Sequence, residues 1–461
     1  MIHNVKLPLQ TTYRLSQIVQ LQLDLLRYAT EPDAQIDYAK ESNTQIDREK
    51  LATYLESFPH YKDRGQTIAR YIVGTQNQQG KFGSLLKKII EGQEGAEVWG
   101  QEIREDKLRA EKRHVIDLME EDILKLALEK TNDTFSFYLL TNEIPPAFTA
   151  CNYHIANTTA KVKYPNWLQA VRTFLQEFYK SLGEGLSAKL FPDNTQYSRQ
   201  DYFQAFVEEN KGQYVCVICD ETSFRTITQK SDHSIHFHSD IEHYFPQSVY
   251  PHLACHPYNL IPICKFCNQA LHGDKDPLNN NSLRRKLKDV FLPYRLGGLA
   301  ESGVLRVNLD NDSPSFQLVN HIDTTNLGEK LKALSDIYDI PGRWQQKQDE
   351  IGDHLWRRLR SFLADDIQIA DVFDSPDHIQ RKLNRLLAYI HDDLGRDPLS
   401  FPTLWWLASL IELETQQDTK SAFLQEIQSW LKHDQSRKEE LDKLATKLRE
   451  RVVIVYQQIQ A

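Results

Sequence analysis

The sequence predicts a mainly α multidomain protein with a central α+β zinc-stapled module, and three observations lead to this prediction. The 461 residues suffice for two to four domains, at roughly 150 residues per domain. Apolar residues recur at helical spacing in both flanks, and two Cys-x-x-Cys pairs lie between them. A hydrophobic content of 40% with 26% charged residues is typical of a globular protein with a packed core.

The change from helical patterns to a cysteine- and histidine-rich centre, and back again, divides the chain into segments. We expect an N-terminal helical domain over 1–145, a helical connector over 146–205, the central module over 206–300, a hairpin and helix over 301–345, and a C-terminal helical domain over 346–461. The apolar stripes of the flanks predict a helical bundle. The alternative is that some of these stripes bind a partner or a second copy of the chain.

Three helical patterns stand out in the N-terminal flank. Their apolar positions are Leu15, Ile18, Val19, Leu23 and Leu26, then Ile116, Met119, Ile123 and Leu126, and then Val171, Phe174, Phe178 and Leu182. Asn166 is the expected N-cap of the third helix. The glycine-containing stretches from Gly74 to Gly83 and from Gly92 to Gly100 predict loops. Their order of residues does not match a phosphate-binding loop, which argues against a nucleotide site in this half.

The C-terminal flank begins with a predicted hairpin, whose strands are expected at 305–309 and 316–319. A helix is expected to open at Ser375 and Pro376, because apolar residues follow at helical spacing up to Leu394. Another apolar stripe runs from Leu441 to Ile459 and predicts a last helix.

Composition also bears on where the protein works. No apolar run approaches the roughly 18 residues that a membrane span requires, and the first residues do not resemble a signal peptide, so we expect a cytoplasmic protein. Four of the six cysteines form Cys-x-x-Cys pairs, which indicates a metal site in a reducing compartment rather than a disulfide scaffold. The formal net charge of −9 argues against a uniformly basic nucleic-acid surface.

The two cysteine pairs predict a structural zinc site. Cys216 and Cys219 form the first knuckle, Cys264 and Cys267 form the second, and 44 residues separate the two pairs. Four thiolates complete the closed tetrahedral shell of structural zinc. The two remaining cysteines are expected to be buried or incidental thiols. Closed zinc of this kind holds a fold together, so any reaction must take place elsewhere.

Histidines and carboxylates gather between and just after the knuckles. Residues 240–246 are expected to form a short strand that runs into a loop, with Glu242 next to His243. Asn268 and His272 are four residues apart on the helix expected after Cys267, so they share a face. Oxygen and imidazole ligands beside a histidine that is free to act as a base predict a hydrolytic metal site.

This segment resembles the HNH (ββα-metal) endonuclease family over residues 212–295, under a fifth of the chain. The matching residues are Glu242, His243 and Pro246, then Asn259 with the run Leu260, Ile261, Pro262, Ile263 and Cys264, and finally Cys267 and Asn268. Asn268 follows Asn259 by nine residues, as in the family pattern. The resemblance implies a treble-clef-like module of two strands and a helix around a divalent ion.

The resemblance also implies roles for single residues. His243 would be the general base, and Asn259 would tie down the loop that positions it. Glu242 and Asn268 would bind the catalytic ion, with His272 as a further ligand or a phosphate contact. The acidic ligand is commonly Asp in this family, and Asp240, two residues earlier on the same side of the strand, is a rival ligand.

The residue types indicate how such a site would work. A neutral imidazole can take a proton from water at cellular pH, and the hydroxide formed would attack a phosphodiester. One divalent cation would stabilise the developing charge. Hard oxygen ligands favour Mg²⁺ or Mn²⁺. We therefore expect two metals per chain, a structural Zn²⁺ and a catalytic Mg²⁺ or Mn²⁺.

Local charge supports a contact with nucleic acid. Residues 230–295 contain eight Lys and Arg against six Asp and Glu, in a chain that is acidic overall. The candidate contacts are Lys265, Lys275, Arg284, Arg285, Lys286 and Lys288. Their contacts with phosphates would be independent of sequence and sensitive to salt. The alternative is that the dense run from Arg284 to Lys288 is a solvated surface.

The expected function is that of an HNH endonuclease cutting DNA, with RNA not excluded as a substrate. By resemblance, such proteins often serve in prokaryotic anti-phage defence, some beside an ATPase or another sensor subunit, and the helical flanks could also pair two copies. One rival interpretation is a zinc finger that binds nucleic acid or protein without cutting. Another is a structural subunit of a larger assembly. The nuclease interpretation requires His243, whereas the binding module does not.

Overall fold

The structure of the protein is a computed structural model that is mainly helical, with a few short antiparallel strand pairs. It describes residues 3–31, 36–37, 45–75, 78–79, 81–91, 105–128, 134–136, 166–182, 197–221, 227–228, 235–236, 239–279, 284–295, 305–308, 315–318, 326–363 and 376–416. The chain divides into two compact units. The first comprises Met1–Ser302 and Ile322–Asp339, and the second Gly303–His321 and Ile340–Ala461.

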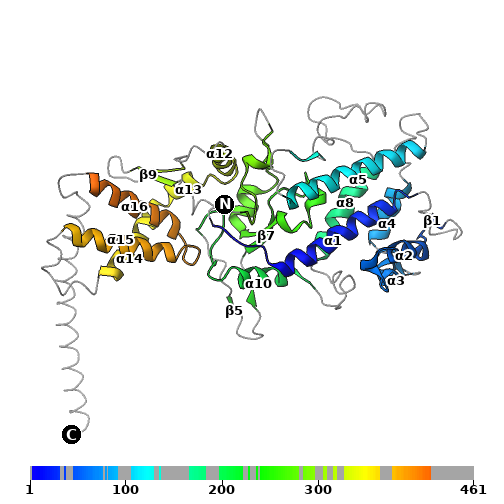
Figure 1. The fold of residues 1–461 in the computed structure, drawn as a ribbon, viewed down its shortest axis with the longest axis horizontal. Coiled ribbons are helices and arrows are strands. Elements are labelled where there is room, and N and C mark those ends of the chain that lie inside the picture. Colours follow the sequence, from blue (N-terminus) through cyan, green and yellow to red (C-terminus); the bar gives the residue numbers. More distant parts are fainter. Residues whose placement is uncertain are drawn as a thin grey trace, which may run out of the picture. The chain divides into compact units, whose positions relative to one another are not determined.

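The first unit holds the N-terminal helices, the expected connector and the central module together. Its helices are α1 (Leu9–Tyr28), α2 (Arg48–Glu56), α3 (Gly65–Val73), α4 (Lys81–Glu91), α5 (Glu105–Ala127), α8 (Asn166–Ser181), α10 (Arg199–Glu209) and α12 (Leu327–Tyr338) (Figure 1). Strands β1 (Ile36–Asp37) and β2 (Gln45–Ile46), β3 (Gly74–Thr75) and β4 (Gln78–Gln79), and β5 (Ile227–Thr228) and β6 (Ile235–His236) form antiparallel pairs. The three helical patterns of the N-terminal flank are confirmed as α1, α5 and α8.

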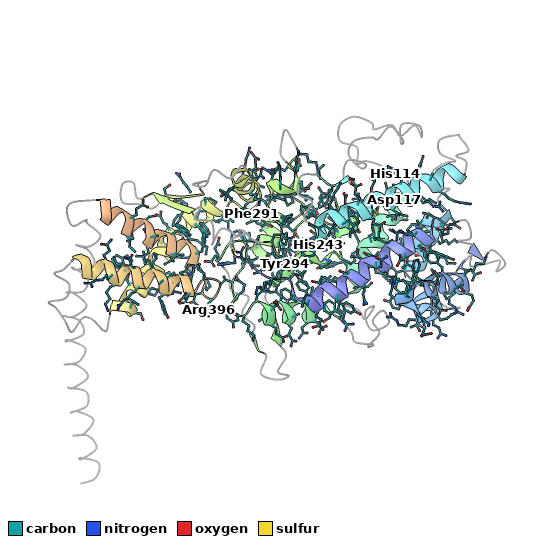
Figure 2. All side chains as sticks on the ribbon, viewed as in Figure 1. His114, Asp117, His243, Phe291, Tyr294 and Arg396 are labelled. Carbon is teal, nitrogen blue, oxygen red and sulfur yellow. The ribbon has the colours of Figure 1, made fainter. Side chains whose placement is uncertain are left out.

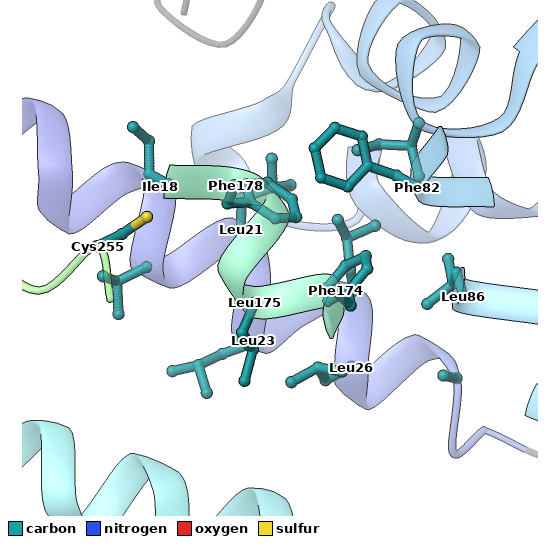
Figure 3. Packing of buried hydrophobic residues seen from close by; sticks show 14 of the residues in the cluster. Ile18, Leu21, Leu23, Leu26, Phe82, Leu86, Phe174, Leu175, Phe178 and Cys255 are labelled. Atoms are coloured by element: carbon teal, nitrogen blue, oxygen red, sulfur yellow. The ribbon is translucent and has the colours of Figure 1, made fainter. Parts of the chain in front are cut away.

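The core of the first unit joins the N-terminal helices to the central module. Ile18 of α1, Phe82 of α4 and Phe174 of α8 pack together, and Cys255 of the central module belongs to the same cluster (Figure 3). These residues are buried almost completely. Burying a side chain of this size contributes roughly 1.5–3 kcal/mol, so a large share of the unit's stability comes from this common core.

The glycine-containing stretch from Gly74 to Gly83 is not the loop that its composition predicts. Residues 74–75 and 78–79 form the β3–β4 pair, and α4 already begins at Lys81. Gly83 therefore lies inside a helix, where a Cβ atom would meet the backbone of Val73 at 3.0 Å. The glycine allows α4 to approach the end of α3 closely, a tertiary requirement that local composition does not reveal. The stretch from Gly92 to Gly100 lies outside the described residues.

A two-stranded hairpin forms the centre of the module. Strand β7 (Ser239–His243) pairs antiparallel with β8 (Leu260–Cys264), so that Glu242 lies opposite Ile261. Single 3-10 turns occupy Pro251–Leu253 and Pro257–Asn259 in the loop between the strands, and a third, Leu287–Asp289, follows the hairpin. The helix expected after Cys267 is confirmed as η5 (Phe266–His272), a π-helix in which the backbone N–H of Gly273 donates to the carbonyl of Asn268.

Two N-terminal helices hold this hairpin through tyrosine hydroxyls. Tyr179 of α8 donates to the carbonyl of Ile241 in β7 at 3.3 Å. Tyr202 of α10 donates to the carbonyl of Leu260 in β8 at 2.7 Å, and Tyr294 donates to the same oxygen at 2.6 Å. The helices therefore fix both strands and are part of the frame that positions any site on the hairpin.

The second unit is a hairpin packed with helices. Strands β9 (Leu305–Asn308) and β10 (Ser315–Leu318) confirm the predicted hairpin to within a residue, and the helices are α13 (Ile340–Gln346), α14 (Gln348–Leu363), α15 (Pro376–Asp392) and α16 (Ser400–Gln416). Helix α15 begins at Pro376, as its sequence predicts. The helix expected near residues 441–459 lies outside the described residues.

A search for membrane-spanning segments covered the described helices of both units. None of them combines the length and the apolar character that a span across a lipid bilayer would need.

Candidate metal centre and active site

The two knuckles come together in the fold. The sulfur atoms of Cys216, Cys219, Cys264 and Cys267 all lie within 4.8 Å of one another, and all four side chains are buried. Backbone N–H groups point at the sulfurs: that of Cys264 donates to Cys216 Sγ and that of Cys267 to Cys264 Sγ, both at 3.4 Å. Four convergent sulfurs are the donor set of structural zinc, so these residues could hold a zinc ion.

The electrostatics of the knuckles favour a bound cation. Burial raises the pKa of the Cys216 thiol. The pKa of Cys264 is lowered instead, because this residue forms hydrogen bonds with the neighbouring cysteines, of which that with Cys216 has the largest effect. The four sulfurs therefore do not all ionise as isolated thiols, because their negative charges would repel one another in a buried place. A divalent cation removes this repulsion and allows all four to act as thiolates.

Asn259 binds the loop that follows β7. Its side chain is completely buried, its Oδ1 accepts from the backbone N–H of Phe245 at 2.7 Å, and its Nδ2 donates to the carbonyls of Phe245 and Leu253, each at 3.0 Å. The amide of Asn259 thus links the two ends of the loop segment from Phe245 to Leu253. Leaving such buried groups unpaired costs roughly 1–3 kcal/mol each, so Asn259 fixes the backbone around Ala254 firmly.

His243 ends β7, and its side chain is buried. Its exposed fraction is 7%, its Nε2 lies 3.0 Å from the carbonyl oxygen of Ala254, and its ring meets the ring of Tyr179 edge-on at 4.2 Å between centroids. Burial lowers the pKa of His243 to about 3, so the imidazole is neutral near pH 7. Figure 2 shows this histidine among the side chains of the central elements.

The contact with Ala254 fixes the tautomer of His243. A carbonyl oxygen can only accept a hydrogen bond, so Nε2 carries the proton of the neutral ring. The lone pair of the imidazole is therefore on Nδ1. A histidine held in this way has the correct form to take a proton through Nδ1.

Glu242 and His272 form a close buried pair. The Oε1 of Glu242 lies 2.6 Å from Nδ1 of His272, and Nε2 of His272 lies 3.1 Å from the carbonyl oxygen of Tyr244. Burial raises the pKa of Glu242, although the bond to His272 opposes this effect. Both ring nitrogens of His272 therefore face oxygen atoms.

Two further contacts support the ligand candidates on η5. The ring of His272 stacks on Tyr338, the last residue of α12, at 5.9 Å between centroids. Asp240 accepts from Nδ2 of Asn268 at 3.2 Å and from Nε2 of Gln269 at 2.9 Å. The amide nitrogen of Asn268 is thus engaged by Asp240, and only its oxygen could serve as a metal ligand.

The chemical types of the ligand atoms that Glu242, Asn268 and His272 offer are suitable for a divalent ion. These residues offer one carboxylate, one amide oxygen and one imidazole, a mixture that suits Mg²⁺ less than Mn²⁺ or Zn²⁺. Among the described residues, the four cysteines form the one group of three or more His, Cys, Asp or Glu side chains that lie close enough to share an ion. Within the same part of the chain, Glu242 and His272 have no third residue of these types close enough to share an ion with them. A metal bound by this pair would therefore need Asn268 as its third protein ligand.

The basic residues near the hairpin differ in how many contacts their side chains make within the protein. Arg285 is buried, contacts Asp336 and donates to the carbonyl of Asn279 at 3.1 Å, so it holds the chain together. Arg284 contacts the hydroxyl of Tyr250 and donates to Thr134 Oγ1 at 3.0 Å. Both guanidiniums therefore serve the packing of the first unit.

The lysines of the same set are more accessible. Lys265 and Lys286 are exposed, and Lys288 is partly buried. Lys275 is exposed as well, and its Nζ lies 3.4 Å from the carbonyl oxygen of Ile337. The lysines are thus better placed than the two arginines to meet a phosphate.

Sequence patterns did not single out the residues that surround His243 and His272 from other elements. Tyr179, Arg199 and Tyr338 come from α8, α10 and α12, outside the two knuckles and the strands between them. No local motif marks them, because their positions arise only when the helices pack against the hairpin.

Comparisons with known proteins identify no relative. No protein-family profile, no curated protein and no solved structure matches the chain.

Proposed function

We propose that the protein is a metal-dependent endonuclease that hydrolyses phosphodiester bonds of DNA, with His243 as the general base. The observation that carries the proposal is the form of His243. The ring is neutral, its Nε2–H is bound to Ala254, and none of the described residues forms a hydrogen bond with its Nδ1. The next residue along β7, Glu242, pairs with His272 of η5.

The residues of this chain would act as follows. Nδ1 of His243 removes a proton from water, whose oxygen bonds to phosphorus while the bond to the 3′ oxygen breaks. The Ala254 carbonyl accepts a stronger hydrogen bond from the imidazolium that forms. Asn259 keeps that carbonyl in place through the loop backbone. A Mg²⁺ or Mn²⁺ ion, bound by Glu242, Asn268 and His272, would supply stabilisation of the phosphate charge.

The low pKa of His243 sets a condition on this mechanism. A base whose pKa is about 3 is weak at neutral pH. A phosphate next to the ring would raise the pKa, because a negative charge stabilises the imidazolium. The proposal therefore requires that the substrate reaches His243 and displaces part of the structure that buries it, such as the ring of Tyr179.

The test uses the purified full-length chain with supercoiled plasmid and Mg²⁺ or Mn²⁺. We expect nicking by the wild-type protein and a loss of rate by about 10²–10⁴-fold in His243→Ala, the usual contribution of a general base. His391→Ala is the matched control, since the same change there removes a side chain that is 65% exposed on α15. Zinc content and melting temperature should be nearly unchanged in both variants. Cutting by His243→Ala at the wild-type rate would disprove the proposed role.

A second candidate function is a zinc finger that binds nucleic acid or protein without cutting. The burial of His243 beneath Tyr179 favours it, because a base must reach its substrate. This candidate expects that His243→Ala changes neither binding nor zinc content, whereas Cys216→Ala unfolds the module.

Activity of the purified chain alone would count against an obligate ATPase or sensor partner of the kind found in defence systems.

A further inference from the structure

Helix α10 brings an arginine to the hairpin. The helix begins at Arg199, and its start is fixed by Ser198, whose side chain and backbone bind the carboxylate of Asp201. One turn further on, the buried Tyr202 donates to the carbonyl of Leu260 in β8. Residues three apart share a helix face, so the anchor at Tyr202 holds Arg199 on the side of the hairpin.

Arg199 lies over a row of rings that leads to His243. Its guanidinium carbon is 4.8 Å from the centre of the Tyr179 ring, and that ring meets the His243 imidazole edge-on. Tyr179 is itself held by its hydroxyl contact to β7. The phenol is therefore a fixed platform that both the guanidinium and the candidate base contact.

The guanidinium remains available on this platform. The Arg199 side chain is exposed, and within the part of the chain that the structure describes, no carboxylate lies within ion-pair distance of it. The nearest acid along the helix, Asp201, is engaged by Ser198. An exposed guanidinium that has no acidic partner among the described residues is suited to receive an anion.

We propose that Arg199, held over Tyr179, is a phosphate-binding subsite beside His243 that α10 contributes to the nucleic-acid site. This inference rests on the proposed function, since it names a residue that positions the same substrate. A guanidinium offers two parallel N–H donors that match a phosphate. The bound phosphate would lie beside the ring of Tyr179, which the imidazole of His243 also contacts. Such a contact carries no base preference, so it serves any sequence.

The test measures binding separately from cutting. A short fluorescent DNA duplex is titrated, at several salt concentrations, with the full chain carrying His243→Ala, which binds without hydrolysis. Adding Arg199→Met should weaken the affinity about tenfold and lower the slope of log affinity against log salt by about one. Arg199→Lys keeps the charge but loses the planar donors, so its affinity should lie between the two.

Arg70→Met is the matched control. Arg70 is also exposed and also lies on a helix of the first unit, α3, which contributes no residue to the candidate site. We expect the control to keep the parent affinity to within about twofold. Zinc content and melting temperature are followed in every variant, and Arg199→Met should leave both unchanged because its side chain is exposed.

The outcomes separate this inference from the proposed function. Equal affinity and equal salt slope in the Arg199→Met and Arg70→Met proteins would overturn the subsite, even if the wild-type chain cuts DNA. Binding that depends on Arg199 in a chain that never cuts would support the subsite and disprove the hydrolysis. A chain that binds no duplex at all would overturn both.

Discussion

At the scale of single residues, two buried histidines of the central module show how similar surroundings can serve different roles. Burial lowers the pKa of both His243 and His256 to about 3. His256 uses both ring nitrogens, because its Nδ1 accepts from the backbone N–H of Tyr258 and the ring also bonds to the backbone of Ile123. His243 uses one nitrogen for Ala254. The first pattern is that of a structural residue, and the second leaves a lone pair for chemistry.

The burial of His256 predicts a loss of stability in acid. The unfolded chain binds a proton at this histidine near pH 6.5, and the folded chain does so only near pH 3. Protonation therefore favours the unfolded state as the pH falls below 6.5, and the effect reaches about 2 kcal/mol at pH 5. In His256→Asn, the amide oxygen can accept from Tyr258, and no group titrates at this position. Between pH 7 and pH 5, the free energy of unfolding of the wild-type protein should therefore fall by about 2 kcal/mol more than that of the variant.

Chemical denaturation at a series of pH values measures this difference. Other titrating groups, His243 included, are common to the two proteins, so their contributions cancel in the comparison. Curves of stability against pH that run parallel for the wild-type and His256→Asn proteins would contradict the prediction.

Residue order in the sequence was enough to point at Glu242, His243, Asn259, Asn268 and His272. Asn259 does bind the loop backbone, and Glu242 does meet His272. The sequence could not show that the ring of His243 meets the ring of Tyr179, a residue of α8. Nor could it show that Arg285 is buried against Asp336. Both facts depend on side chains that lie far away along the chain.

At the scale of elements, the four cysteines join β8, η5 and the first knuckle. Strand β8 ends at Cys264 and η5 contains Cys267, while Cys216 and Cys219 come from the segment after α10. The first knuckle is also tied to the N-terminus, since His3 Nε2 lies 2.6 Å from Asp220 Oδ1 and both side chains are buried. A metal at this point would thus hold together elements that are distant in sequence.

Removal of the metal should therefore unfold this part of the protein. Structural zinc contributes on the order of 10 kcal/mol, as much as the whole stability of many domains. We expect one zinc per chain by mass spectrometry of the metal, and a clear fall in melting temperature in Cys219→Ser or after treatment with a strong chelator. Cys255→Ser is the control, because Cys255 is equally buried but lies outside the cluster. Unchanged zinc content in Cys219→Ser would contradict the prediction.

Elements with a strong local signal were predictable. Helix α8 starts at Asn166 and α15 at Pro376, and the β9–β10 hairpin lies where alternating residues flank a turn. Helix α4 was missed because Gly83 suggests a loop when it is read without its neighbour α3. The π-helical form of η5 was also not visible, since the spacing of Asn268 and His272 is compatible with either kind of helix.

At the scale of the whole molecule, the core of the N-terminal helices extends into the central module. Ala254, Cys255 and Leu260 belong to the cluster formed by α1, α4 and α8. Helix α8 also bonds to the loop after β7, where Nε2 of Gln176 donates to the carbonyl of Gln247 at 2.9 Å. The family resemblance spans only residues 212–295, so it gave no sign that helices from elsewhere complete the module.

This shared core predicts that the module cannot fold alone. A fragment of residues 206–300 would expose the apolar side chains that α1 and α8 cover, so it should be insoluble or lack cooperative melting even with zinc. A fragment of residues 1–339, which retains all of the first unit, should bind zinc and melt cooperatively. Circular dichroism melting of the two fragments distinguishes these results. A shorter fragment that melts as sharply as the longer one would show that the helices are dispensable.

The stacking of Tyr338 on His272 has a mechanical consequence. Tyr338 ends α12, and after Asp339, which adopts a left-handed conformation, the chain passes at Ile340 into the second unit. The chain also crosses between the units at residues 302–303 and 321–322. Of the three covalent crossings, the one at Ile340 directly follows the ring that stacks on His272, so a displacement of the backbone there would move the support of that imidazole.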